Sequence, residues 1–316
     1  MKIGSLCTGY GGLDMAVESF FNAETVWTCE FDKYASQVIE KRINKPNHGD
    51  LKTTDWTQVE PIDILTAGYP CQPFSTAGLR KGADDERHLW PYIKNIIGIL
   101  RPKFVVLENV RGHFGLGFRE VLSDLASCGY DATWRLVRAS DVGAPHRRER
   151  LFILAYAQDS GDGCLPVGIQ SSNAQFGSNT FANANGSGLQ GSIRQRHGFT
   201  ENSQIAANTN SDARTQSRRT SGSLRTEDYR LRTRQDQRKT RSKSRFSREM
   251  DKKAVPAPLD QGKLNAKFVE YMMGLPKGWV TDIGLSRTQQ LKILGNGVVP
   301  QQAEYALKLL WEQACG

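Results

Sequence analysis

The most specific chemical feature of the sequence is a cysteine that stands between two prolines. Cys71 lies between Pro70 and Pro73, shortly after an apolar run at residues 62–66 that reads as a buried strand. The prolines disfavour a helix, and a rigid loop at the end of a strand is where a nucleophile is presented to its substrate. A buried, inert thiol is the usual alternative for a cysteine. The setting of Cys71 favours a nucleophile.

A carboxylic acid and two arginines flank two other apolar runs. Glu108 follows the run at residues 104–107, and Arg148 and Arg150 come at the start of the run at 151–155. Because the two arginines are two residues apart, their side chains can point the same way. A thiol, an acid and paired guanidinium groups in one cleft suit an electron-poor ring that must be held and protonated.

A glycine-rich segment and two acids are typical of nucleotide-type sites. Residues 9–12, with the sequence Gly-Tyr-Gly-Gly, follow the first apolar run and open a helical pattern. Glycines there permit a tight turn and close approach to a ligand, although a plain strand-to-helix turn explains them equally well. Glu30 ends the second apolar run and could accept hydrogen bonds from ribose hydroxyls, and Asp50 could reach an adenine amino group. Each acid could instead be a surface residue or a helix cap.

Strand and helix patterns alternate through the first half of the chain. Strands are expected at residues 3–7, 25–29, 62–66, 104–107 and 151–155, and helices at 14–21, 33–42, 89–100 and 118–128. This alternation predicts an α/β fold with a doubly wound, mostly parallel sheet and helices on both faces. Ligands bind such sheets in the loops that follow the carboxyl ends of the strands.

Composition divides the chain into three parts. Residues 1–156 are the expected catalytic and cofactor-binding core. Residues 157–263 are polar and rich in arginine, and with few apolar side chains to offset its ordering entropy this insert is expected to be irregular or partly disordered. Residues 264–316 regain apolar patterning and are expected to complete the core. Two helices and a loop are predicted in this last part, at 264–273, 301–311 and 295–297.

The positive charge of the chain is concentrated in one block. The net charge is +9, from 42 Lys and Arg against 33 Asp and Glu. Residues 194–248 alone hold 15 basic and 5 acidic residues, so the remainder is close to neutral. A basic block on a neutral body is typical of a surface for a polyanion, most often nucleic acid. A solvated, unstructured insert would explain the same charge run.

The sequence disfavours membrane, secreted and zinc-bound classes of protein. No apolar run approaches the roughly 18 residues of a membrane span, and no signal-peptide stretch opens the chain. The six cysteines include no C-x-x-C pair, which argues against a structural zinc site, and a disulfide framework would need a smaller secreted chain. We therefore expect a cytoplasmic protein with reduced thiols and no bound metal.

Taken in order, these motifs resemble those of the DNA (cytosine-5) methyltransferases. The resemblance covers about residues 1–156 and 264–316. It rests on residues 9–12, 30, 49–51, 70–72, 108–110, 146–150, 264–270 and 295–298. Two positions depart from the family's pattern. Cys7 stands where the family often has Phe, and His146 replaces the usual Gln while both following arginines remain.

The resemblance implies a Rossmann-like, S-adenosylmethionine-dependent methyltransferase fold and a reaction at cytosine. Attack of the Cys71 thiolate at C6, with protonation of N3 by Glu108, would make C5 nucleophilic toward the methyl group of the cofactor. Arg148 and Arg150 would hold the base. Because C6 is inaccessible inside a duplex, the target base must be flipped out, at a cost of a few kcal/mol.

The resemblance also assigns contacts and partners. S-adenosylmethionine would lie against Thr8, Gly9, Tyr10, Gly11, Gly12, Glu30, Phe31, Asp50, Leu51, Pro70, Asn296 and Val298. The insert would be the small target-recognition region, and DNA would be contacted by Gln72, Ser75, Arg194, Arg196, Arg218 and Arg219. The expected partner is double-stranded DNA, and a restriction endonuclease could act on the same site. A monomer is expected.

Other functions stay open on the sequence alone. An RNA cytosine-5 methyltransferase of the same fold would share the chemistry. A non-catalytic DNA-binding relative would not need an intact Cys71, Glu108 and arginine pair. A thiol hydrolase would need a histidine base for Cys71, and the five histidines suggest no convincing partner. DNA amino-methylases are disfavoured because their catalytic loop contains adjacent prolines, which this chain lacks.

Overall fold

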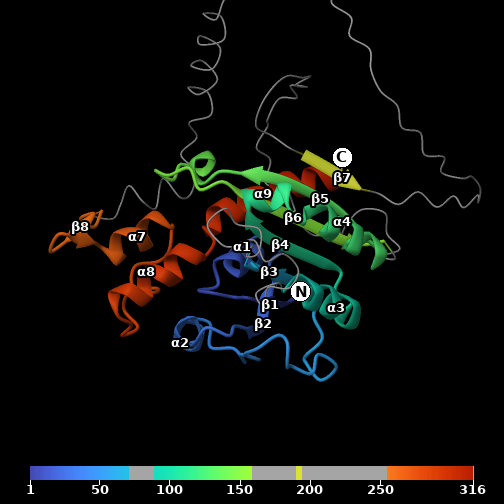
Figure 1. Cartoon of the computed structure of the whole chain (residues 1–316), viewed down its shortest axis with the longest axis horizontal. Helices are drawn as coiled ribbons and strands as arrows, with labels where there is room; N and C mark the ends of the chain where they lie inside the picture. The colour runs from blue at the N-terminus through green and yellow to red at the C-terminus, as the bar shows by residue number, and fades with distance from the viewer. Residues whose placement is uncertain (71–88, 159–189, 194–254, 316) are drawn as a thin grey trace, which may run out of the picture.

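A seven-stranded sheet forms the centre of the molecule, with the strand order β2-β1-β3-β4-β6-β5-β7 (Figure 1). The structure, a computed structural model, describes residues 1–70, 89–158, 190–193 and 255–315. The strands are β1 (Lys2–Leu6), β2 (Glu24–Cys29), β3 (Ile64–Ala67), β4 (Phe104–Val110), β5 (Tyr130–Val137), β6 (Arg150–Ala157) and β7 (Gln190–Ile193). Strands β2, β1, β3 and β4 pair in parallel, whereas β6, β5 and β7 add an antiparallel edge. The predicted doubly wound, mostly parallel sheet is confirmed.

Helices cover both faces of this sheet, and a further helix lies at its edge. One face packs against two helices, α3 (Trp90–Leu100) and α4 (Phe118–Ser127). The opposite face packs against α1 (Gly12–Phe21) and α9 (Pro300–Cys315), so the end of the chain docks on its beginning. At the edge, α2 (Lys33–Arg42) contacts the C-terminal part of the chain. Among the helices that the structure describes, none is long and apolar enough to cross a membrane.

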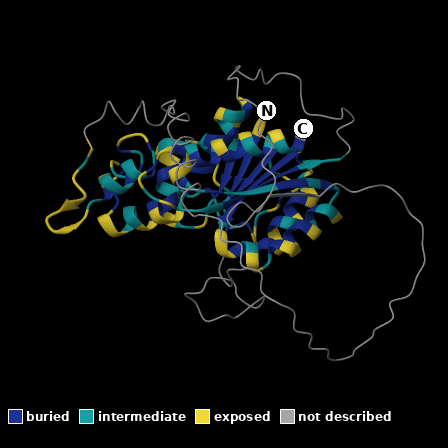
Figure 2. Ribbon diagram, turned by 90° about the horizontal axis from the view of Figure 1, so that it is seen from above, coloured by how far each residue is buried: buried dark blue, intermediate teal, exposed yellow. Residues whose placement is uncertain are grey.

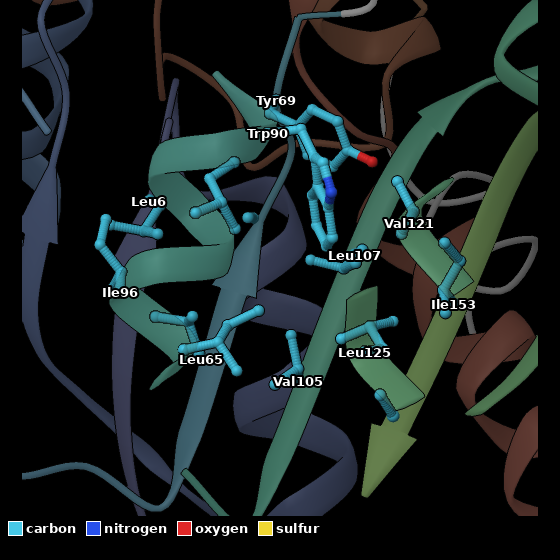
Figure 3. Close-up of a cluster of buried hydrophobic side chains, with 14 of the residues drawn as sticks. Leu6, Leu65, Tyr69, Trp90, Ile96, Val105, Leu107, Val121, Leu125 and Ile153 are labelled. Carbon is cyan, nitrogen blue, oxygen red and sulfur yellow. The ribbon is translucent and has the colours of Figure 1, made fainter. Parts of the chain in front are cut away.

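Alternation along the strands produces two hydrophobic cores. In β4, Val105 and Leu107 pack toward α3 and α4, in the cluster drawn in Figure 3. Phe104 and Val106 point to the other face, toward α1 and α9. All four side chains are buried, as is the sheet in general (Figure 2). Burial of such a side chain contributes about 1.5–3 kcal/mol, so these cores hold the strand ends in fixed relation.

Strand β5 was not predicted, and the antiparallel direction of the predicted strand β6 explains the position of the arginines. No strand was predicted between the helix at 118–128 and the run at 151–155, yet β5 fills that interval. Because β6 runs antiparallel to β4, the first residue of β6 lies beside the last residue of β4, and Arg150 pairs with Val110. The arginines therefore reach the edge of the sheet where the parallel strands end.

The C-terminal part adds a hairpin and two helices beside α2. They are β8 (Leu259–Asp260), β9 (Lys263–Leu264), α7 (Ala266–Met272) and α8 (Arg287–Asn296). Helix α8 was not predicted, and its presence corrects the expected loop at 295–297, because Gly295 and Asn296 form its last turn. Lys292 of α8 forms an ion pair with Asp32, 2.7 Å from nitrogen to oxygen, beside α2. This contact helps to fix the last part of the chain against the first.

Candidate active site

The segment between β1 and α1 forms an open loop at the carboxyl edge of the sheet. Gly9 has a φ of +59°, a conformation that favours glycine. A Cβ atom at Gly9 would meet no heavy atom of the described residues within 4 Å. The amide of Gly11 donates to the carbonyl oxygen of Thr8 at 2.9 Å, which closes the turn. The loop therefore presents main chain, rather than side chains, to the space beside Gly9.

Glu30 joins this loop to the end of β2. One carboxylate oxygen accepts from the Gly9 amide and the other from the Asp32 amide, each at 2.8 Å. Burial raises the pKa of Glu30 above its usual value, and these amide bonds oppose the rise. Each carboxylate oxygen can accept a second hydrogen bond, so Glu30 can also accept hydrogen bonds from the hydroxyl groups of a ribose. The next residue, Phe31, is 79% exposed and offers an aromatic face beside the loop.

The segment at residues 49–51 lies against the same strand end. The thiol of Cys29, the last residue of β2, donates a hydrogen bond to the Gly49 carbonyl oxygen, 3.2 Å from Sγ. Leu51 is buried in the core beneath, and the Asp50 carboxylate accepts from the Lys52 amide at 3.0 Å. The structure thus places Asp50 and Glu30 at neighbouring points of one edge.

The C-terminal segment closes the other side of the glycine loop. The Tyr10 hydroxyl donates to the Val298 carbonyl oxygen at 2.7 Å, across 288 positions of sequence. A Cβ atom at Gly12 would lie 2.2 Å from that same carbonyl oxygen, so glycine is needed for the two segments to meet. Asn296, exposed at the end of α8, lies two residues before Val298. The last motif and the first therefore build one wall.

A single methyl group at Gly12 should disrupt this wall. We expect Gly12→Ala to lower the free energy of unfolding by about 1–3 kcal/mol, because the Val298 main chain must move, and to weaken cofactor binding. The matched control is Gly98→Ala in α3, where a Cβ atom meets no described atom within 4 Å. That change should be neutral or stabilising by up to about 1 kcal/mol. Chemical denaturation checks both, and equal stability of the two variants would contradict the predicted contact.

A buried acid at the end of β4 pairs with a partly buried arginine at the start of β6. The Nε atom of Arg150 is 2.9 Å from Oε1 of Glu108, and the two side chains are 17% and 8% exposed. Burial raises the pKa of Glu108 to about 7, while Arg150 and Arg148 act in the opposite direction. Glu108 can therefore hold a proton near neutral pH and still release it.

Glu108 lies next to the wall that the glycine loop and the C-terminal segment form. A Cβ atom at Gly68, just after β3, would be 3.6 Å from Oε2 of Glu108 and 3.9 Å from Cγ2 of Val298. The end of β3, the Glu108 carboxyl group and the C-terminal segment therefore lie side by side at one point of the sheet edge.

The two arginines have different partners, which their spacing could not show. The Nη2 atom of Arg148 donates to the carbonyl oxygens of Gly295 and Gly297, at 2.8 and 2.6 Å. The Arg148 carbonyl oxygen accepts in turn from the fully buried amide of Gln302 at 2.8 Å. Burial lowers the pKa of the Arg148 guanidinium. Arg148 thus fastens the C-terminal segment to β6, whereas Arg150 contacts the acid.

Three residues that sequence reasoning missed hold the main chain that leads to Cys71. The Asn109 side chain donates to the Tyr69 carbonyl oxygen at 3.1 Å, and the Tyr69 hydroxyl lies 3.0 Å from Nε2 of His113. All three side chains are buried. Asn109 lies within the motif at 108–110 and Tyr69 directly precedes the motif at 70–72, but neither motif predicted the contact between them.

Several predicted residues cannot be placed. Pro70 is the last described residue before a gap and is exposed. Outside the described residues lie Cys71, Gln72, Ser75, Arg194, Arg196, Arg218 and Arg219.

The fold is that of the Rossmann-like methyltransferases. The Dnmt2 methyltransferase of S. pombe has a similar structure, with a TM-score of 0.57, 15% identity and 99% of each chain covered. A putative DNA modification methyltransferase from an E. coli prophage is similar too, with a TM-score of 0.56, 20% identity and the same coverage.

The chain belongs to the C-5 cytosine-specific DNA methylases, whose family model matches residues 1–311. The resemblance seen in the motifs is thereby confirmed, and this family uses S-adenosylmethionine as methyl donor. Type II methyltransferase M.BsuFI of Bacillus subtilis is 35% identical over 161 residues, and M.NlaX of Neisseria lactamica is 35% identical over 185 residues. The matches cover 49% and 55% of this chain but 39% and 58% of those relatives, less than two thirds of either.

Proposed function

We propose that the protein is a DNA cytosine-5 methyltransferase that modifies a flipped-out cytosine in duplex DNA with a methyl group from S-adenosylmethionine. The observation that carries the proposal is the position of Glu108. This acid has a pKa raised to about 7, pairs with Arg150 and borders the cofactor wall at Gly68 and Val298. A proton held there at neutral pH is what N3 of a cytosine ring requires.

The residues around the glycine loop fit the cofactor. The open main chain at Gly9 and the Glu30 carboxylate can receive its nucleoside, and the exposed Phe31 ring can lie against its base. We assign the remaining contacts to the residues that build the loop, its neighbouring segment and its C-terminal wall, namely Thr8, Tyr10, Gly11, Gly12, Asp50, Leu51, Pro70, Asn296 and Val298. When bound, S-adenosylmethionine supplies a sulfonium methyl group to the activated C5 carbon.

The chain's own residues activate the base. In the proposed step the Cys71 thiolate forms a bond to C6 while Glu108 gives its proton to N3, and the electrons of the C5=C6 double bond become available at C5. After C5 has taken the methyl group, loss of the C5 proton to a base re-forms the C5=C6 double bond and expels the Cys71 thiolate, and N3 returns its proton to Glu108. Arg150 keeps Glu108 aimed at the ring, and Asn109 fixes the main chain two residues before the nucleophile. Arg148 positions the wall behind them.

A direct comparison of substrates tests the proposal against an RNA-specific enzyme. We expect the initial rate of methyl transfer to unmethylated duplex DNA to exceed that to transfer RNA by at least about two orders of magnitude, since the protein must tell deoxyribose from ribose at each contact. Incorporation of labelled methyl groups into each nucleic acid measures the ratio. A rate that favours transfer RNA would replace the proposed substrate.

We further propose that residues 157–263 recognise the target between the two parts of the catalytic core, 1–156 and 264–316. The support is their charge, since residues 194–248 hold 15 basic residues against 5 acidic ones. Strand β7, which lies within residues 157–263, pairs with β5 of the core. Contacts are assigned to Arg194, Arg196, Arg218 and Arg219, with Gln72 and Ser75 on the catalytic side. A cognate restriction endonuclease and a monomeric state belong to the same proposal.

The salt dependence of DNA binding tests this role. Each phosphate contact adds about 0.9 to the slope of log affinity against log salt concentration. We therefore expect deletion of residues 194–248 to reduce that slope by several units, as measured by fluorescence anisotropy over a salt series. An unchanged slope would show that these residues do not contact the backbone.

A further inference from the structure

A cluster of buried polar side chains lies beneath the glycine loop, and the proposed function assigns a role only to its member Thr8. Ser5 and Thr8 come from the end of β1 and the loop, Asp14 from the first turn of α1, and Thr66 from β3. Their exposed fractions are 1%, 7%, 3% and 1%. Burial of polar groups costs free energy unless they are hydrogen-bonded, so these four side chains need hydrogen-bond partners.

Two short hydrogen-bonded links run through the cluster. The Thr66 hydroxyl donates to Oδ1 of Asp14 at 2.5 Å, which ties α1 to the neighbouring strand β3. The hydroxyls of Ser5 and Thr8 lie 2.9 Å apart, which ties the loop to β1. Ser5 also hydrogen-bonds to the Asp14 carboxyl group. Oδ2 of Asp14 is buried and lies 4.0 Å from where a Cβ atom of Gly11 would be.

The loop above needs such support because Cys7, at its beginning, has a strained backbone with a φ of +53°. Gly9 and Gly11, at +59° and +81°, adopt the same region without strain because they are glycines. A non-glycine residue such as Cys7 persists in this region only when its surroundings determine it. The Glu30 carboxylate holds the open side of the loop at the Gly9 amide. Asp14 is the carboxyl group on the buried side.

We propose that Asp14 is a positioning residue for the cofactor loop, acting through Thr66 and through the first turn of α1. The inference rests on the proposed function, because it assumes that this loop binds S-adenosylmethionine. Asp14 does not touch the cofactor. It fixes α1 and Gly11 relative to β1 and β3, so that the main chain at Gly9 is held in its binding conformation before the cofactor arrives.

The burial of Asp14 is consistent with a role beyond that of a helix-capping acid. Desolvation raises the pKa of Asp14 to about 6, and Glu18 on the same helix acts in the same direction. Ordinary acids in the first turn of a helix are exposed and stabilised by the helix dipole. Asp14 instead retains a buried carboxyl group at the cofactor loop.

The test compares four variants of the full chain by titration calorimetry with S-adenosylmethionine, together with melting temperatures. Asp14→Ala and Thr66→Val each break the link, and we expect about tenfold weaker binding from the loss of one hydrogen bond to a carboxyl group. Asp14→Asn keeps an oxygen that accepts from Thr66, so it should bind within about threefold of the unaltered protein. The Asp14→Ala and Thr66→Val changes combined should be no worse than either alone.

Glu18→Ala is the matched control. Glu18 lies one turn further along α1, where it accepts from the Thr25 amide at 3.1 Å, away from the loop. This change should lower the melting temperature and leave cofactor affinity unchanged. Unaltered affinity in Asp14→Ala, or an equal loss in Glu18→Ala, would overturn the positioning role. A full-length protein that does not bind S-adenosylmethionine at all would overturn the proposed function itself.

Discussion

Glu108→Gln should reduce methyl transfer to DNA by a factor of about 10² to 10⁴, the usual contribution of a general acid. Glutamine has nearly the same shape and can still contact Arg150, but it has no proton to give to N3. Because Glu108 is buried and its pKa is raised to about 7, the acid is available at neutral pH in the unaltered protein. Cofactor affinity should change little, since Glu108 borders the wall without forming it.

The pH profile makes this prediction specific. A general acid acts in its protonated form, so the rate that depends on Glu108 should be full below its pKa and fall as the pH rises through about 7. Glu108→Gln should abolish that alkaline fall. The control is Glu149→Gln, a neighbouring glutamate paired with Arg111 and Arg138, whose pKa is lowered. Single-turnover rates between about pH 6 and pH 9 measure both; a profile unchanged by Glu108→Gln would exclude Glu108 as the acid.

Cys71→Ala should abolish methyl transfer and covalent attachment to DNA together. A duplex with 5-fluorocytosine at the target separates these steps, because fluorine cannot leave C5 as a proton does and the bond from sulfur to C6 persists. We expect a denaturation-resistant complex with the unaltered protein, and loss of at least about 10³-fold in its formation with Cys71→Ala, since no other group supplies the nucleophile. Gel electrophoresis detects the complex.

The Cys128→Ala variant is the control for the cysteine change. Cys128 lies at the end of α4, on the opposite side of the fold from the strand ends that carry Glu30 and Gly68. It should retain both activity and the covalent complex. A complex that forms equally well with Cys71→Ala would assign the nucleophile to another residue.

Local patterns predicted the parts of the site that lie close together in sequence. The run at 104–107 predicted β4 and placed Glu108 at its end, and the helix at 33–42 has the predicted bounds. The glycine loop was predicted because strand, glycines and helix are consecutive. Hydrophobic periodicity carries this information within about ten residues.

Elements with mixed faces escaped prediction. Strand β5 places Asp131 and Arg135 among its apolar residues, so no strict alternation marks it. Helix α8 buries only Ile293 and Leu294 and has no strong apolar stripe. Only the beginning of α8 has a local sequence signal, because Ser286 and Gln289 form a capping box.

Contacts between distant segments could not be predicted from periodicity. The spacing of Arg148 and Arg150 suggested a shared task. In an all-parallel sheet, residues that precede a strand would lie at the edge opposite Glu108. Because β6 is antiparallel to β4, the arginines lie at the same edge as Glu108. Arg150 pairs with Glu108, whereas Arg148 donates to the carbonyl oxygens of Gly295 and Gly297. Such partners are set by tertiary packing.

The most direct test of the proposed reaction is to identify the nucleoside that receives the methyl group. Unmethylated duplex DNA is incubated with the protein and S-adenosylmethionine labelled in its methyl group, then hydrolysed to nucleosides that are separated by chromatography. The label should be found in 5-methyldeoxycytidine, and Cys71→Ala and Glu108→Gln should both remove it. Label on an exocyclic amine, or label on C5 that survives Cys71→Ala, would contradict the proposed reaction.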